Sequence, residues 1–242
     1  MSILNFANPQ RFQAFARYAI PVFFVIGMVA ASWGFYKVFF VIPDDYQQKE
    51  TIKILFVHVP AAWMSLWIYI FIAISAFGTL VWKHPLADVS AKAALGLGAS
   101  FAFITLVTGA LWGKPMWGTW WQWDARLTSM LILFLLYLGL IAVWNAIDDQ
   151  QEAGRLSAIL SLVGIFLIPF IILSVEYFET LHQGKSVNPF GQTKLDDVYL
   201  YPLIAVTIGV MCLFASLHML EMRNELMRRR VRRLQMMKAM KG

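Results

Sequence analysis

Six long apolar runs follow one another along the chain, separated by short polar segments. They cover about residues 18–42, 54–82, 90–112, 127–147, 156–177 and 199–220. Each run has roughly the 20 apolar residues that a helix needs to cross the hydrocarbon core of a bilayer. Because lipid offers no hydrogen-bond partner to an exposed backbone, the runs are predicted to be helices. The pattern therefore predicts an all-α, polytopic membrane protein with six transmembrane helices.

The composition supports this prediction. Of the 242 residues, 60% are hydrophobic and 14% are charged, whereas ordinary soluble domains are nearer half apolar and a quarter charged. The polar segments are too short to form a separate core, so residues 1–242 are predicted to be a single integral membrane domain. Arg11 and Arg17 precede the first run as in a signal peptide, but that run continues to Ile42. Its length favours a retained helix over a cleaved peptide.

The Lys and Arg residues divide unequally between the two predicted faces of the membrane. One face carries thirteen: Arg11, Arg17, Lys83, Lys92, Arg155 and the eight in the last twenty residues. The other carries seven: Lys37, Lys49, Lys53, Lys114, Arg126, Lys185 and Lys194. Cytoplasmic loops are enriched in Lys and Arg, so both termini are predicted to lie in the cytoplasm. The segments 43–53, 113–126 and 178–198 are then expected to lie outside.

A basic tail at 221–242 accounts for much of the net charge of +6. Because the charge is concentrated there, it indicates a membrane-associated segment and no nucleic-acid partner. One interpretation is a positive anchor for the sixth span, helped by anionic membrane lipid. The other is an amphipathic helix that contacts a cytoplasmic partner. Its apolar edge would consist of Leu226, Met227, Val231, Leu234 and Met237.

The second outside segment is rich in tryptophan. The string "WGTWWQWD" occupies 117–124, and five of the ten tryptophans of the chain fall within 112–123. Tryptophans at the membrane interface form belts, but a belt is spread over several span ends. Indole rings stack on flat apolar molecules and remove a large area from water. The cluster therefore favours a planar ligand such as haem, or a smaller one such as quinone.

The four histidines are sorted by the predicted topology. Haem iron is usually held by axial histidines. His84 and His218 fall on the cytoplasmic side, whereas His58 and His182 share the side of the tryptophan segment. His58 is expected in the first helical turn, which Pro60 also fits, and there the helix dipole favours a neutral imidazole. The alternative for either histidine is a capping or interfacial residue.

Charged residues flank the tryptophan string. Lys114 and Arg126 bracket it, and they would pair with the two propionates of a haem. A solvated loop charge or a contact with a lipid headgroup is the alternative for both. Asp124 would repel a propionate, so it is predicted to cap the fourth span or to pair with Arg126.

The chain lacks the motifs of several other classes. It has one cysteine, Cys212, and therefore neither a Cys-x-x-Cys pair nor the Cys-x-x-Cys-His site of a c-type cytochrome. No Ser/His/Asp arrangement, metal cluster or phosphate-binding glycine loop is present. The sequence predicts a binding protein and no enzyme.

The tryptophan string resembles the WWD signature, WGxxWxWD, of the haem-handling proteins of cytochrome c biogenesis. The longer strings "WGKPMWGTWWQWDARLTS" (112–129), "HVPAAW" (58–63) and "LHQG" (181–184) resemble the CcmC family within that group. The resemblance implies that the loop binds haem b as a transient cargo in the periplasm, with His58 and His182 as axial ligands. The loop residues that it implies are Trp117, Gly118, Trp120, Trp123 and Asp124, with Trp121 at a variable position.

The resemblance also implies a setting for this binding. The protein would lie in the bacterial inner membrane and deliver haem to the periplasmic haem chaperone CcmE. It would work with an ABC transporter made of CcmA and CcmB, and with the small membrane protein CcmD. Two alternatives remain from the residues themselves. One is a channel that carries haem across the bilayer, and the other is a haem or quinone redox subunit, which would need histidines in mid-span.

Overall fold

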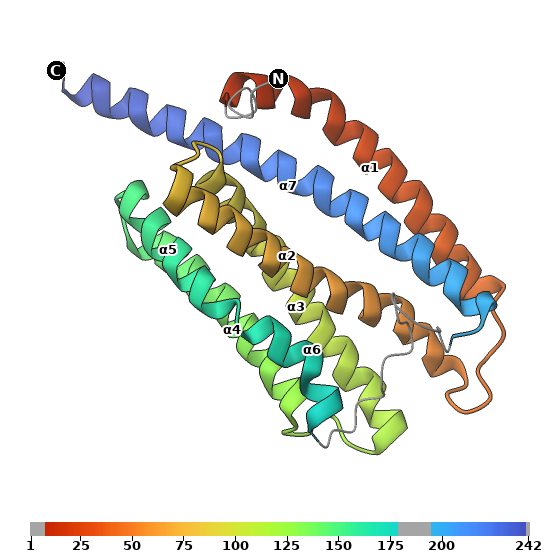
Figure 1. Ribbon diagram of the computed structural model, residues 1–242. Helices are drawn as coiled ribbons and strands as arrows, with labels where there is room; N and C mark the ends of the chain where they lie inside the picture. Colours follow the sequence, from red (N-terminus) through yellow and green to blue (C-terminus); the bar gives the residue numbers. More distant parts are fainter. Residues whose placement is uncertain (1–7, 179–194, 241–242) are drawn as a thin grey trace.

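The computed structural model describes residues 8–178 and 195–240, which fold into helices joined by short turns. The helices pack side by side into an elongated bundle (Figure 1). In chain order the elements are α1 (Pro9–Phe40), the short 3-10 helix η2 (Glu50–Ile54), α2 (Leu55–Trp82), α3 (Ala87–Trp117), α4 (Ala125–Ala146), α5 (Gln150–Gly164), α6 (Leu167–Tyr177) and α7 (Asp197–Ala239).

Six segments of the described chain are long and apolar enough to cross a membrane: α1, η2 with α2, α3, α4, α5 with α6, and α7. The prediction of an all-α, multi-pass membrane protein with six spans is therefore confirmed. The first span begins earlier than expected because Asn8 accepts a hydrogen bond from the Gln10 N–H and Pro9 occupies the first helical position. Both features favour the start of a helix.

The fifth span is broken into α5 and α6, whereas the apolar run predicted one continuous helix over 156–177. Pro169 has no N–H to donate to the carbonyl of Ile165, and its ring crowds that carbonyl, so the helix is interrupted there. Gly164 ends α5 against α2, where a Cβ would collide with the hydroxyl of Tyr69.

The predicted outside loop at 113–126 is shorter in the structure. Residues 113–117 continue α3, and α4 already begins at Ala125, so the connecting loop is 118–124. Gly118 ends α3 with a φ of 77°, a left-handed conformation that favours glycine. Trp117 therefore belongs to a helix, and the other three tryptophans of the string belong to the loop.

The bundle has two distinct ends. The end that holds η2 and the 118–124 loop is called the loop end below. The end where α1 begins and α7 finishes is called the tail end (Figure 1). The main core lies between α2, α3, α4, α5 and α6. α1 packs against α7, where Gly27, Gly34 and Gly209 allow the two backbones to approach closely.

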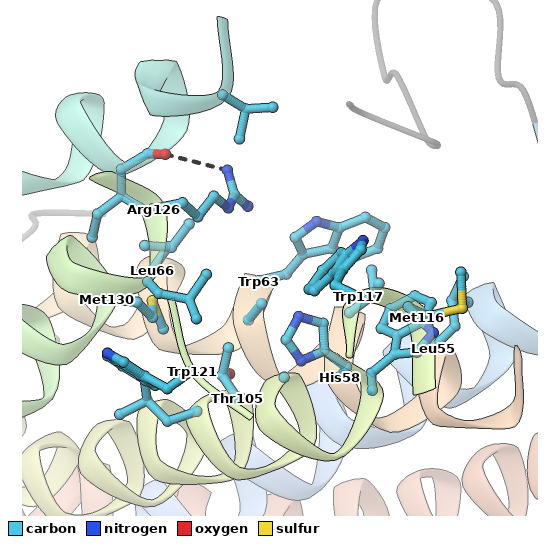
Figure 2. A pocket seen from close by; sticks show the side chains of 18 of the residues that line it. Leu55, His58, Trp63, Leu66, Thr105, Met116, Trp117, Trp121, Arg126 and Met130 are labelled. Atoms are coloured by element: carbon cyan, nitrogen blue, oxygen red, sulfur yellow. Dashed lines mark hydrogen bonds between the residues drawn. The ribbon is translucent and has the colours of Figure 1, made fainter. Parts of the chain in front are cut away.

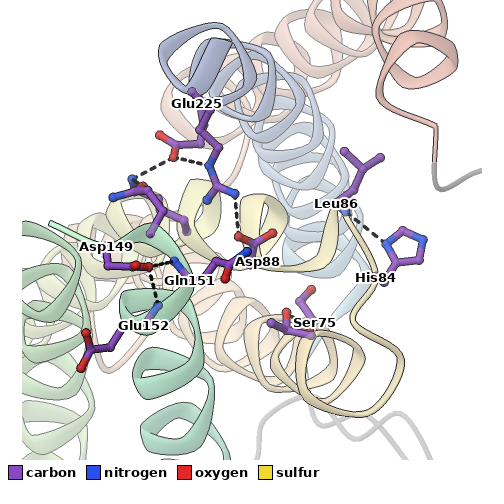
Figure 3. Close-up of polar contacts among 12 residues, drawn as sticks. Ser75, His84, Leu86, Asp88, Asp149, Gln151, Glu152 and Glu225 are labelled. Carbon is purple, nitrogen blue, oxygen red and sulfur yellow. Dashed lines mark hydrogen bonds and ion pairs between the residues drawn. The ribbon is translucent and has the colours of Figure 1, made fainter. Parts of the chain in front are cut away.

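A cluster of ion pairs between side chains joins α7 to α3 at the tail end. Arg229 of α7 donates to Asp88 of α3 at 2.6 Å and to Glu225 at 2.9 Å, and Lys92 of α3 also contacts Glu225 at 2.9 Å. Arg229 thus bridges Glu225 and Asp88, which are both labelled in Figure 3. Beyond this cluster α7 continues as a helix, and residues 230–240 are exposed on all sides.

Candidate functional site

A cavity of about 170 Å³ opens at the loop end of the bundle. Its walls come from the first turns of α2, the last turns of α3, the beginning of α4, and parts of α6 and α7. Most of the lining is apolar: Leu55, Val59, Ala62, Leu66, Leu106, Leu127, Ile171, Val175 and Leu203. Two methionines, Met116 and Met130, and four tryptophans, Trp63, Trp112, Trp117 and Trp121, also line it. Figure 2 labels both methionines and three of these tryptophans, Trp63, Trp117 and Trp121. These side chains suit a large apolar ligand.

Among the residues that the structure describes, His58 is the histidine that lines this cavity, and it is only 6% exposed. Its Nδ1 lies 3.0 Å from Oγ1 of Thr108 on α3. The edge of the His58 ring meets the ring of Trp112 with centroids 5.7 Å apart. Figure 2 shows the imidazole pointing into the same space as the rings of Trp63 and Trp117. His58 is thus held by α3 while it faces the cavity.

The position of His58 near the beginning of α2 agrees with the prediction, but that of Pro60 does not. Because η2 leads directly into α2 at Leu55, Pro60 is the sixth residue of α2 and lies inside the helix. It cannot donate to the carbonyl of Phe56, the partner that the helix would give it.

The tryptophans of the string divide into two pairs. Trp117 and Trp121 line the cavity, whereas Trp120 and Trp123 are 55% and 74% exposed. Trp121 and Trp123 meet edge to face with centroids 5.4 Å apart. Nε1 of Trp121 is buried and has no hydrogen-bond partner among the described residues. The loop therefore presents one aromatic surface to the cavity and another to its surroundings.

The two cations around the string also differ. Arg126 lines the cavity, and its Nη1 donates to the Ile171 carbonyl of α6 at 3.2 Å. This bond is the one drawn in Figure 2. Lys114 instead donates to the Gly118 carbonyl at 3.0 Å and lies over the ring of Trp120. Lys114 thus contacts the loop itself, whereas Arg126 is directed to the cavity.

Asp124 is 8% exposed and caps α4. Its Oδ1 accepts a hydrogen bond from the Leu127 N–H at 2.7 Å, which confirms the predicted capping role. The cap sets the first turn of α4, and this turn carries Arg126. Asp124 therefore influences the cavity indirectly, by fixing the backbone of the turn that carries Arg126.

The remaining histidines lie elsewhere or outside the described residues. At the tail end, Nε2 of His218 lies 3.0 Å from the Ser90 carbonyl, and Nδ1 of His84 accepts from the Leu86 N–H at 3.3 Å. Both positions agree with the predicted sorting of histidines between the two ends. His182 lies in 179–194, outside the residues that the structure describes.

The sequence pattern did not reveal the residues that hold His58. Thr108 and Gly109 lie in the string "VTGALW" at the C-terminal end of an apolar run. The only signal in the sequence for this contact was a threonine and a glycine followed one helical turn later by Trp112. A Cβ on Gly109 would come within 3.2 Å of Cε1 of His58, so the glycine makes room for the ring.

Comparison with known proteins shows the family to which this chain belongs. The sequence matches the family model of CcmC, heme exporter protein C, over residues 2–237. This chain belongs to the CcmC family. It is 51% identical to heme exporter protein C of Bradyrhizobium diazoefficiens over 99% of this chain and 90% of the relative. The corresponding protein of Escherichia coli K12 is 44% identical, over 90% of this chain and 88% of the relative. That of Paracoccus denitrificans is 40% identical, over 96% of each chain.

The family membership confirms the resemblance that the WWD string indicated. The relatives are named as heme exporter proteins, which are transport components by name. With six candidate spans, this member of the CcmC family is a multi-pass membrane protein.

Proposed function

We propose that this chain binds haem as cargo in the loop-end cavity and delivers it to the haem chaperone CcmE during the biogenesis of c-type cytochromes. Haem b is the form bound, and the cavity faces the periplasm from the bacterial inner membrane. The chain acts as a binding and handover protein without a catalytic residue of its own. It works in a complex with the ABC transporter subunits CcmA and CcmB and with CcmD.

The observation that carries the proposal is His58 in a cavity walled by tryptophans. A neutral imidazole is an axial ligand of haem iron, and indole rings supply flat apolar surface for the macrocycle. His182 is proposed as the second ligand, on the opposite face of the haem. Trp117 and Trp121 line the cavity and form the haem platform, and Gly118 turns the chain between them.

A propionate requires a cationic partner at the rim of the cavity. The guanidinium of Arg126 has five N–H donors, and the bond to the Ile171 carbonyl uses one of them. Arg126 is therefore the proposed propionate contact, and Nε1 of Trp121 is a further donor at the cavity. Lys114 is the weaker candidate because it does not line the cavity, and its Nζ instead donates to the Gly118 carbonyl of the loop.

The two exposed tryptophans suit the handover step. Trp120 and Trp123 are both exposed, and Trp123 packs edge to face against Trp121, which lines the cavity. A chaperone that contacted them would stand beside the bound haem. Aromatic residues are enriched in such protein–protein contacts.

The channel alternative is less well supported. The cavity is lined only by residues from the loop-end half of the bundle. At the tail end, ion pairs among Asp88, Lys92, Glu225 and Arg229 join α3 to α7. The redox alternative requires histidines in mid-span, whereas His58 lies close to the beginning of α2.

Visible spectra of the purified protein, alone and mixed with CcmE, test the proposal. The wild type is expected to purify partly loaded with haem and to lose that haem to the chaperone. His58→Ala and His182→Ala are each expected to retain less haem, and added imidazole should partly restore it. His84→Ala, at the opposite end of the bundle, is the matched control and should bind haem normally.

Normal haem content with an unchanged Soret band in both His58→Ala and His182→Ala would contradict the proposed ligation. A wild type that purifies with stoichiometric haem and never releases it to the chaperone would indicate a permanent cytochrome instead.

A further inference from the structure

The hydroxyl of Thr108 contacts three groups at once, and these contacts determine where its proton lies. Oγ1 is 2.6 Å from the Ile104 carbonyl and 3.3 Å from the Thr105 carbonyl. It is also 3.0 Å from Nδ1 of His58. A hydroxyl has one proton to donate and two lone pairs that accept.

The carbonyl contacts decide the direction of the bond to His58. A carbonyl oxygen has no proton, so at 2.6 Å from the Ile104 carbonyl the hydroxyl must be the donor. If the hydroxyl donated to His58 instead, two oxygen acceptors would face each other at that distance. The hydroxyl therefore accepts at its other side, and Nδ1 of His58 donates.

We propose that Thr108 is a positioning residue that fixes His58 as the Nδ1–H tautomer, so that the lone pair of the neutral imidazole falls on Nε2, the nitrogen that binds haem iron. The inference rests on the proposed function and adds to it the residue that prepares the ligand. Hydrogen bonds of this kind set the tautomer, the ring orientation and the basicity of histidines that bind metals.

The surroundings of the ring fix its plane as well as its tautomer. Gly109 follows Thr108 and leaves room for Cε1 of His58, where a Cβ would approach within 3.2 Å. Trp112, one turn further along α3, meets the ring edge to face. Nε1 of Trp112 in turn donates to Oε1 of Gln48 at 3.1 Å, which holds the indole in place. Three residues of one helix thus position the imidazole before any ligand is present.

The tautomer is measurable without haem. Nitrogen-15 NMR of the haem-free protein, labelled at histidine and assigned by the loss of signal in His58→Ala, distinguishes Nδ1–H from Nε2–H. The wild type and Thr108→Ser are expected to show His58 as Nδ1–H. Thr108→Val, which has the same shape without the hydroxyl, should show a substantial Nε2–H population. An Nε2–H ring in the wild type, or an unchanged ring in Thr108→Val, would overturn the proposal.

A double-mutant cycle tests whether the hydroxyl acts through His58. Thr108→Val should weaken haem retention by roughly 10–100-fold, the usual effect of removing a partner of a metal-binding histidine. Thr108→Ser should retain haem like the wild type. In the His58→Ala background, Thr108→Val should cause no further loss. Thr79→Val, which removes a similar hydroxyl bonded to the Ser75 carbonyl of α2, is the control for a merely structural effect.

The two possible failures are distinguishable. An equal loss of haem from Thr108→Val in both backgrounds would overturn the role of Thr108 alone, because the hydroxyl would then act without His58. Haem retention that is unchanged in His58→Ala would overturn the proposed ligation and the role of Thr108 together.

Discussion

At the scale of single residues, the tryptophans of the WWD string are not equivalent. Trp121 lines the cavity. Trp123 packs against the ring of Trp121 and is 74% exposed. Burying one large apolar side chain contributes roughly 1.5–3 kcal/mol, which corresponds to about 10–100-fold in affinity. We therefore expect Trp121→Ala to weaken haem retention by about that factor, measured by titration of the purified protein with haem.

Trp123→Ala is the matched variant for this prediction. It should leave haem retention nearly unchanged and reduce haem-dependent recovery of CcmE in a pull-down. The double variant Trp120→Ala with Trp123→Ala should reduce that recovery further. If the double variant captured CcmE as well as the wild type, the exposed pair would be an ordinary interfacial belt.

At the scale of an element, the beginning of α4 depends on one side chain. Asp124 caps the helix at the Leu127 N–H, and Arg126 lies in the same first turn. Removing a capping side chain costs about 0.5–2 kcal/mol of stability. Asp124→Ala is expected to lower the thermal unfolding temperature in detergent and to weaken haem retention, because Arg126 is no longer held at the cavity.

Asp124→Asn separates the cap from the negative charge, since an asparagine oxygen also accepts the bond. It should keep most of the stability and of the haem retention. An alanine variant as stable as the wild type would show that the cap does not hold this turn.

At the scale of the whole molecule, α7 links the bundle to the basic tail. Its 43 residues span about 65 Å at 1.5 Å per residue, whereas the hydrocarbon core is about 30 Å thick. A helix that lies on lipid is oriented along the membrane surface, but the end of α7 continues the direction of its span (Figure 1). This geometry favours contact with a protein, for which we propose the ATPase subunit CcmA.

Truncation after Arg229 tests this contact, because it removes the exposed tail and keeps the ion cluster. Haem binding should be unchanged, and recovery of CcmA by co-purification should fall. Truncation after Arg228 also removes Arg229, so Glu225 and Asp88 lose a partner and this protein should unfold at a lower temperature. Undiminished recovery of CcmA with the protein that ends at Arg229 would leave the tail as a lipid anchor.

A large part of this structure could be predicted from local sequence patterns. Twenty apolar residues in a row specify a membrane helix by themselves, because the cost of exposing backbone to lipid does not depend on the neighbours of the helix. The six spans, the capping role of Asp124 and the placement of His58 at one end and of His84 and His218 at the other could therefore be predicted. The break between α5 and α6 could also have been inferred from Pro169, but the continuous apolar run concealed it.

Only the tertiary structure decided which of these residues act together. The pairing of His58 with Thr108 joins residues fifty positions apart, and no periodicity along either helix specifies that contact. The division between Trp121 and Trp123, and the link from Arg126 to the Ile171 carbonyl, likewise depend on how α3, α4 and α6 pack. Sequence patterns determine whether a segment forms a membrane helix, because the free energy of that helix depends mainly on the segment's own residues. Packing fixes which atoms face the cavity because that depends on the relative placement of whole helices.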